Sequence, residues 1–128
     1  MEHHLNQNPL QELQTINSYK NNWPKGWGKE TCLMGIINAT PDSFSDGGKY
    51  LDPERAKNKV SKLINQGADI IDIGAESSKP YSDPVSIKDE LSRLSIIKSI
   101  DFNNKTLSID SYKYKIIQNC LENGFGMI

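Results

Sequence analysis

A cluster of oxygen-bearing side chains lies in one polar stretch, residues 38–48. The stretch carries one amide, three hydroxyls and two carboxylates, from Asn38, Thr40, Ser43, Ser45, Asp42 and Asp46. These groups suit a metal-bound, phosphorylated ligand, because Mg²⁺ prefers oxygen ligands and is often shared with substrate phosphates. The alternative is a solvated surface loop in which the two carboxylates form local turns. Composition alone does not separate the two interpretations.

The polar stretch directly follows a short apolar run, residues 33–37. The β-branched and aliphatic residues of this run are typical of a strand that is buried on both faces. Enzymes of the α/β class build active sites where such strands end and loops begin. We therefore expect the polar stretch to lie at the carboxyl edge of a parallel sheet.

A helix and a second strand are predicted next. Asp52 suits the N-cap of the helix and Pro53 its first position, and Gly67 suits its end. The apolar residues fall at helical spacing on one stripe, which consists of Ala56, Val60, Leu63 and Ile64. A strand over residues 68–74 follows, so this part of the chain forms a right-handed crossover unit.

The same pattern then repeats. Ser86 with Asp89 three residues later is typical of a helix start, and we expect a third strand over residues 106–110. The apolar stripe of that helix contains Ile87, Leu91, Leu94 and Ile97. A further helix is predicted from about Tyr112 to Gly124, and residues 125–128 indicate the start of a fourth strand. Alternating strands and helices predict an α/β fold with a parallel sheet.

Two carboxylates lie on the predicted strands. Asp72 is inside the second strand, where a carboxylate is costly unless it is hydrogen-bonded. It either braces neighbouring loops, which we favour, or serves a ligand. Asp110 ends the third strand, where it could bind a ligand or act as the N-cap of the next helix.

Charge and cysteine content limit the possible partners and compartments. The chain has 128 residues and a formal net charge of −1, which argues against nucleic-acid and anionic-membrane partners. No apolar run reaches the length of a membrane span, and the first residues do not resemble a signal peptide. Cys32 and Cys120 predict two buried free thiols. We expect a cytoplasmic protein.

Three stretches resemble dihydropteroate synthase, the folate-pathway enzyme that sulfonamides inhibit. Residues 34–48 resemble the family signature at the end of its first strand. Residues 74–80, Gly-Ala-Glu-Ser-Ser-Lys-Pro, are similar to its Gly-Gly-Glu-Ser-Thr-Arg-Pro. Here Ser78 keeps the hydroxyl of Thr, and Lys79 keeps the charge of Arg without its planar fork. Residues 108–113, Ser-Ile-Asp-Ser-Tyr-Lys, are similar to its Ser-Ile-Asp-Thr-Tyr-Lys.

The resemblance implies the first three to four strand–helix units of a TIM (β/α)₈ barrel over residues 33–128. Residues 1–32 would form a partly irregular leader, in which we expect Trp23 and Trp27 to pack over the first strand or the barrel floor. A complete barrel needs about 250 residues, roughly twice this chain. We therefore expect the amino-terminal half of a barrel that is inactive, or nearly so, by itself.

The resemblance also implies an activity and its site. The enzyme condenses (7,8-dihydropterin-6-yl)methyl diphosphate with 4-aminobenzoate, giving 7,8-dihydropteroate and diphosphate, and it uses Mg²⁺ and forms a homodimer. By resemblance Asn38 would bind the Mg²⁺-diphosphate, Asp110 would anchor the pterin, and Ser78 and Lys79 would lie near the diphosphate and the aminobenzoate. No residue is identified as an acid or base. A mobile lid over the leaving group would consist of Thr40, Pro41, Asp42, Ser43, Phe44, Ser45, Asp46, Gly47 and Gly48.

Two alternatives stay open. One is a pterin-binding module of the methyltetrahydrofolate methyltransferase type, which shares the barrel and an acidic pterin anchor. Such a module lacks the polar stretch at residues 40–48, because it binds no diphosphate. The other is a non-catalytic half-barrel that binds a partner chain, for which residues 1–32 give no identifying signal.

Overall fold

Three strand–helix units make up the part of the chain that the computed structural model describes, which is residues 23–44, 51–77 and 80–128. The elements, in chain order, are β1 (Met34–Asn38), α2 (Pro41–Phe44), α3 (Pro53–Asn65), β2 (Ile70–Gly74), α4 (Ile87–Lys98), β3 (Thr106–Asp110) and α5 (Tyr114–Glu122). The first three predicted strands and the three predicted helices are present, within one or two residues of the expected bounds. No helix in the described part of the chain is both long enough and apolar enough to cross a membrane.

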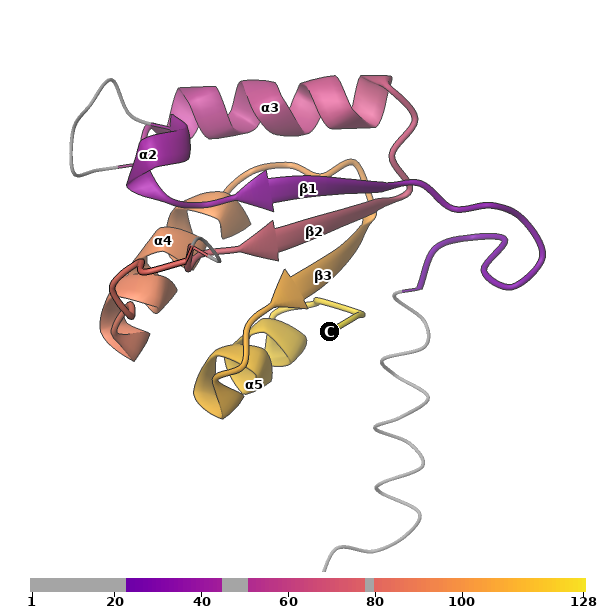
Figure 1. Cartoon of the computed structure of the whole chain (residues 1–128). Helices are drawn as coiled ribbons and strands as arrows, with labels where there is room; N and C mark the ends of the chain where they lie inside the picture. Colours follow the sequence, from indigo (N-terminus) through magenta and orange to yellow (C-terminus); the bar gives the residue numbers. More distant parts are fainter. Residues whose placement is uncertain (1–22, 45–50, 78–79) are drawn as a thin grey trace, which may run out of the picture.

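The strands form one sheet in the order β1-β2-β3, and both pairs are parallel. Figure 1 shows the three arrows pointing the same way, with α3 running alongside β1. Met127 forms an isolated parallel bridge with Ser108, and its carbonyl accepts the Ile109 N–H at 3.1 Å. The chain therefore begins a fourth parallel pairing beside β3, as residues 125–128 predicted.

The helices cover only one side of this sheet. Ile37, Ile71, Ile73 and Ile109 point to the covered side, where each is at most 1% exposed. On the other side of β1, Met34 is 49% exposed and Ile36 is 58% exposed. The covered side is thus a packed core, whereas on the opposite side two apolar side chains of β1 remain accessible, although Ile70 of β2 is buried there.

Local capping signals explain where α3 and α4 begin. The Asp52 carboxylate accepts the backbone N–H groups of Glu54 and Arg55 at 2.9 and 3.4 Å. The Ser86 hydroxyl accepts the Asp89 N–H at 3.1 Å and donates to the Asp89 carboxylate at 2.7 Å. These bonds confirm both predicted N-caps. Each cap could be predicted because it depends only on residues within one helical turn.

The start of α5 differs from the prediction. The helix begins at Tyr114, and Lys113 is its N-cap residue, without a side-chain capping bond. The suggestion that Asp110 caps this helix is therefore wrong. The Lys113 side chain instead donates to the carboxylates of Glu76 and Glu90, so the helix starts at a residue with tertiary contacts and without a local side-chain cap.

The aromatic pair and the cysteines complete the described fold. Trp23 and Trp27 stack edge to face, with ring centroids 5.4 Å apart, and the Trp23 indole donates to the Gly126 carbonyl at 3.0 Å. Both cysteines are free, as predicted. Cys120 is buried, and burial raises the pKa of its thiol. Cys32 is only half-buried, which corrects the expectation of two buried thiols.

Candidate functional site at the carboxyl ends of the strands

The last residues of the three strands form one row across the sheet. The register pairs Asn38 with Gly74, and Gly74 with Asp110. The central glycine leaves a gap in this row, because a Cβ atom placed at Gly74 would lie 3.5 Å from Asp110 Oδ2. An amide and a carboxylate therefore flank a flat stretch of backbone at the carboxyl edge of a parallel sheet, where α/β proteins bind ligands.

Both polar side chains of this row are open to ligands. Asn38 and Asp110 are exposed, and neither side chain hydrogen-bonds to a residue within the described segments. An ionised carboxylate only accepts hydrogen bonds, whereas an amide both donates and accepts. The row can thus receive N–H donors at one end and a metal ion or polar oxygen at the other.

The first part of the predicted lid is helical. Residues Pro41–Phe44 form α2, the Thr40 and Ser43 hydroxyls lie 2.9 Å apart, and Phe44 is buried in the core. Proline at the first helical position and a hydroxyl before it favour this turn. The expectation of a loop was therefore wrong for these residues. The remaining lid residues, Ser45, Asp46, Gly47 and Gly48, lie outside the described residues.

Ser78 and Lys79 lie outside the described residues, so their positions relative to the row stay a prediction. Asp72 is half-buried in the middle of β2, and its side chain makes no hydrogen bond or ion pair within the described segments. The loop-bracing role that we favoured for Asp72 is therefore not seen there.

A buried charge network lies next to the row. Lys113 Nζ donates to the carboxylates of Glu76 and Glu90, and its distance to Glu90 is 2.7 Å. Glu76, just past β2, also accepts the Val85 N–H at 3.1 Å and the Tyr112 hydroxyl at 3.3 Å. Glu90 on α4 is 0% exposed. The network thus joins the segments that follow β2 and β3 to the covering helix.

The network changes the protonation of its members. Burial by itself disfavours the Lys113 ammonium, but the hydrogen bonds that it donates to Glu76 and Glu90 outweigh burial and raise the pKa of Lys113. The hydrogen bond from Lys113 outweighs burial at Glu76 and lowers the pKa of that carboxyl. Lys113 is therefore a fixed positive charge in contact with two carboxylates.

Sequence analysis missed this network, although one signal was present. Glu90 falls four residues before Leu94 and seven before Ile97, both of which are fully buried. It therefore lies on the apolar stripe of α4, where we had expected Ile87, which is 39% exposed. A charged residue on an apolar stripe indicates a buried ion pair, because such residues are rarely buried unpaired.

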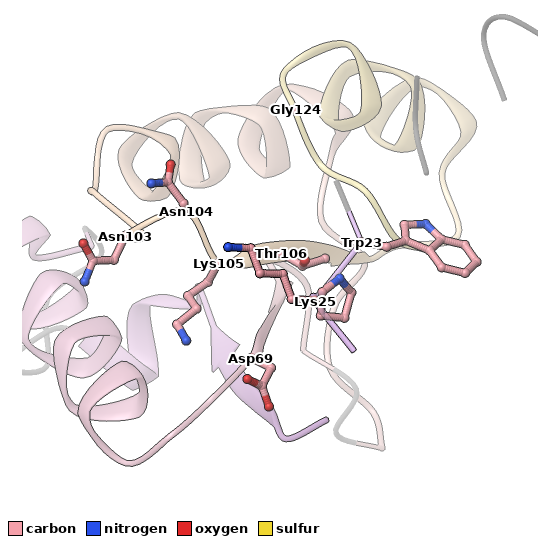
Figure 2. A pocket seen from close by; sticks show the side chains of 9 residues that line it. Trp23, Lys25, Asp69, Asn103, Asn104, Lys105, Thr106 and Gly124 are labelled. Carbon is pink, nitrogen blue, oxygen red and sulfur yellow. The ribbon is translucent and has the colours of Figure 1, made fainter. Parts of the chain in front are cut away.

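A cavity of about 780 Å³ lies elsewhere, at the amino ends of the strands. Figure 2 shows its side chains, which come from the turn before β1, from Asp69 at the start of β2 and from the segment that enters β3. Trp23 is among the lining residues, so this indole lies at the amino-terminal end of the sheet. The cavity is therefore at the opposite end of the strands from Asn38 and Asp110.

Comparisons with known proteins identify the family of this chain. The family model described as "Pterin binding enzyme" matches residues 34–128. Dihydropteroate synthase from Clostridium beijerinckii is 48% identical over 104 residues, which are 79% of this chain and 38% of that protein. This chain thus spans well under half of the length of that relative.

Solved structures give the same result. Dihydropteroate synthase from Clostridium difficile, crystallised in the presence of pteroic acid, matches with a TM-score of 0.63 and 38% identity. Dihydropteroate synthase from Xanthomonas albilineans with 4-aminobenzoic acid matches with a TM-score of 0.64 and 35% identity. Each match covers 77% of this chain and 38% of the other.

These matches confirm the predicted fold class. The three parallel strands and their helices correspond to part of the TIM-barrel fold of dihydropteroate synthase. The chain belongs to the pterin-binding enzyme family, within which its described units match dihydropteroate synthases.

Proposed function

We propose that this chain supplies one substrate-binding edge of a dihydropteroate synthase. The reaction joins (7,8-dihydropterin-6-yl)methyl diphosphate to 4-aminobenzoate and releases diphosphate. The observation that carries the proposal is the row of Asn38, Gly74 and Asp110, whose two end side chains are exposed and make no hydrogen bond within the described segments. Its open acceptors and its central gap suit a flat, donor-rich heterocycle with a charged substituent.

In this proposal Asp110 binds the pterin edge. A pterin presents a row of N–H donors, and a carboxylate is the side chain that accepts two such donors at once. Gly74 lets the ring approach the strand, because a side chain there would fill the space beside Asp110. The carboxylate thus orients the methylene carbon that is to react.

Asn38 would face the diphosphate at the other end of the row. The described residues contain no group of three His, Cys, Asp or Glu side chains that could hold a metal ion. Mg²⁺ needs no such group, because it commonly binds one or two protein oxygens together with substrate phosphates. The exposed amide oxygen of Asn38 fits that mode. Bound Mg²⁺ would neutralise charge on the leaving diphosphate.

The reaction needs positioning more than acid–base chemistry. The bond between the methylene carbon and the diphosphate oxygen breaks, and the arylamine nitrogen forms a new bond to that carbon and loses a proton. Holding the reactants in line accounts for a large share of such a rate enhancement. Ser78 and Lys79 near the aminobenzoate, and a lid that includes residues 45–48, remain parts of the proposal.

A co-expression experiment tests the proposal. The full chain is produced together with the segment of the C. beijerinckii relative that follows its match to this chain. We expect a complex that releases diphosphate only when 4-aminobenzoate and Mg²⁺ are present, and no turnover by the chain alone. A complex without turnover would contradict the proposal. Pterin binding that is indifferent to diphosphate and Mg²⁺ would favour the methyltransferase alternative.

Matched variants show whether Asp110 has the proposed role. Asp110→Asn removes a charged acceptor, and we expect kcat/KM to fall about 10- to 100-fold in the complex. Asp101→Asn is the control, because Asp101 is an exposed carboxylate that only accepts the Asn103 N–H, at 2.8 Å. Equal activity of the two variants would exclude Asp110 from pterin binding.

A further inference from the structure

Lys113 joins the two segments that leave the carboxyl ends of β2 and β3. It lies three residues after Asp110, and its ammonium contacts Glu76, which lies two residues after Gly74. The same ammonium contacts Glu90 on α4 and lies 4.7 Å from the centre of the Tyr112 ring. One side chain therefore holds both segments and a helix together.

Glu90 makes this attachment strong. Its carboxylate is 0% exposed, and an unpaired charge at such a position is strongly unfavourable. The Ser111 hydroxyl donates to Glu90 at 2.8 Å, and the Lys113 ammonium does so at 2.7 Å. The Lys113 N–H also donates to the Ser111 hydroxyl, at 3.3 Å. Two of the three residues after Asp110 are thus fixed to one buried group.

Asp110 itself has no such support. Its carboxylate makes no hydrogen bond to a residue in the described segments. Its position therefore depends on the backbone, which β3 holds on one side and the Ser111–Glu90 and Lys113–Glu90 contacts hold on the other. In this way the backbone holds Asp110 in place, while both oxygens of its carboxylate stay free to accept hydrogen bonds from a ligand.

We propose that Lys113 is a positioning residue, which fixes the Asp110 carboxylate beside Gly74 through its contacts with Glu90 and Glu76. This inference rests on the proposed function, since it concerns how the pterin-binding carboxylate is held. A lysine suits the position because its compact ammonium can donate to two carboxylates at once. An arginine presents a planar fork in its place.

The test compares two identical substitutions in the co-expressed complex. Lys113→Arg keeps the charge but misplaces the donors, and we expect kcat/KM for the pterin substrate to fall about 10-fold, because small misplacements in a site are costly. Lys98→Arg is the control. Lys98 also links α4 to α5, through Asn119, and it is not part of the network around Asp110. We expect the control to leave the activity unchanged.

A double variant separates positioning from a general structural defect. If Lys113 acts through Asp110, Lys113→Arg should change kcat/KM by less than about twofold in the Asp110→Asn background. Effects that multiply would overturn the inference. If Lys113→Arg does not fold, Ser111→Ala replaces it, because it removes one contact to Glu90 and leaves the ion pairs in place.

Hydrogen exchange on the full chain gives a readout that does not depend on activity. We expect Lys113→Arg to speed amide exchange in residues 110–113, and Lys98→Arg to leave it unchanged. Equal exchange in the two variants would overturn the inference, whether or not the complex is active. An inactive wild-type complex with the expected exchange pattern would instead contradict the proposed function alone.

Discussion

The two sides of the sheet differ in how completely their side chains are partnered. On the helix-covered side, the isoleucines of β2 are fully buried, and the Lys113 network satisfies every charge that it contains. On the other side Ile36 is mostly exposed, and Asn38 and Asp110 keep their polar groups free of bonds within the described residues. The covered side therefore stabilises the fold, whereas the other side keeps free the side chains to which we assign ligand binding.

The largest effect should come from breaking the charge network on the covered side. Lys113→Met leaves the fully buried Glu90 carboxylate with only the Ser111 hydroxyl, and we expect a loss of about 3–5 kcal/mol in the free energy of unfolding. Urea denaturation of the full chain measures it. Lys98→Met is the matched control, because its partner Asn119 is uncharged. A loss below about 1 kcal/mol for Lys113→Met would mean that the network contributes little.

The same substitution should cost more on the covered side of the sheet than on the opposite side. Ile71→Ala creates a cavity on the covered side, and we expect it to cost about 2–5 kcal/mol. Ile36→Ala removes an exposed side chain and should cost less than about 1 kcal/mol. The two isoleucines lie on adjacent strands, which makes them a fair pair. Equal losses in urea denaturation would show that the open side also stabilises the isolated chain.

Acid should reduce the stability of the folded protein by a smaller amount, through the Glu76 carboxylate on the covered side. The pKa of Glu76 is lowered in the folded protein from an ordinary value of 4.5. The ionised Glu76 carboxylate therefore stabilises the folded protein fully above that ordinary pKa. This stabilisation is lost as the pH falls through the lowered pKa that Glu76 has in the folded protein. Lys113 does not add to this loss, because its raised pKa matters only in alkali. We expect Glu76→Gln to show a smaller drop in the urea midpoint than wild type between about pH 7 and about pH 3.

The smallest effect on stability should come from a substitution on the side of the sheet that the helices do not cover. Asp110→Asn breaks no hydrogen bond to a described residue, and we expect the free energy of unfolding to change by no more than about 0.5 kcal/mol. The same variant should impair the complex strongly. A clear loss of stability in thermal or urea unfolding would show that Asp110 has a structural partner, and it would weaken the case for ligand binding.

Sequence analysis succeeded where the deciding interactions are local. The N-caps at Asp52 and Ser86 depend on neighbours within one turn, and the strands were apparent from short apolar runs. It failed where a residue far away in the sequence determines the local structure. Lys113 and Glu90 are separated by 23 positions, so nothing near Tyr114 shows that α5 begins there. The same is true of Glu90, whose burial depends on a cation from another unit.

The site was predictable only in part, for the same reason. Asn38 and Asp110 follow their strands directly, so a parallel sheet had to bring them to one edge. That Gly74 lies between them depends on the register, which the sequence does not state. The helical turn of α2 was missed because polar residues and proline also occur in loops.

The bond from the Trp23 indole to the Gly126 carbonyl connects residues that are 103 positions apart. Closing a loop of this length is entropically costly, so we expect the contact to form late in folding. The chain has two tryptophans, and both lie in the segment before β1, so their combined fluorescence is an intrinsic probe of its docking. Their emission reports when this segment has docked beside the segment that follows α5.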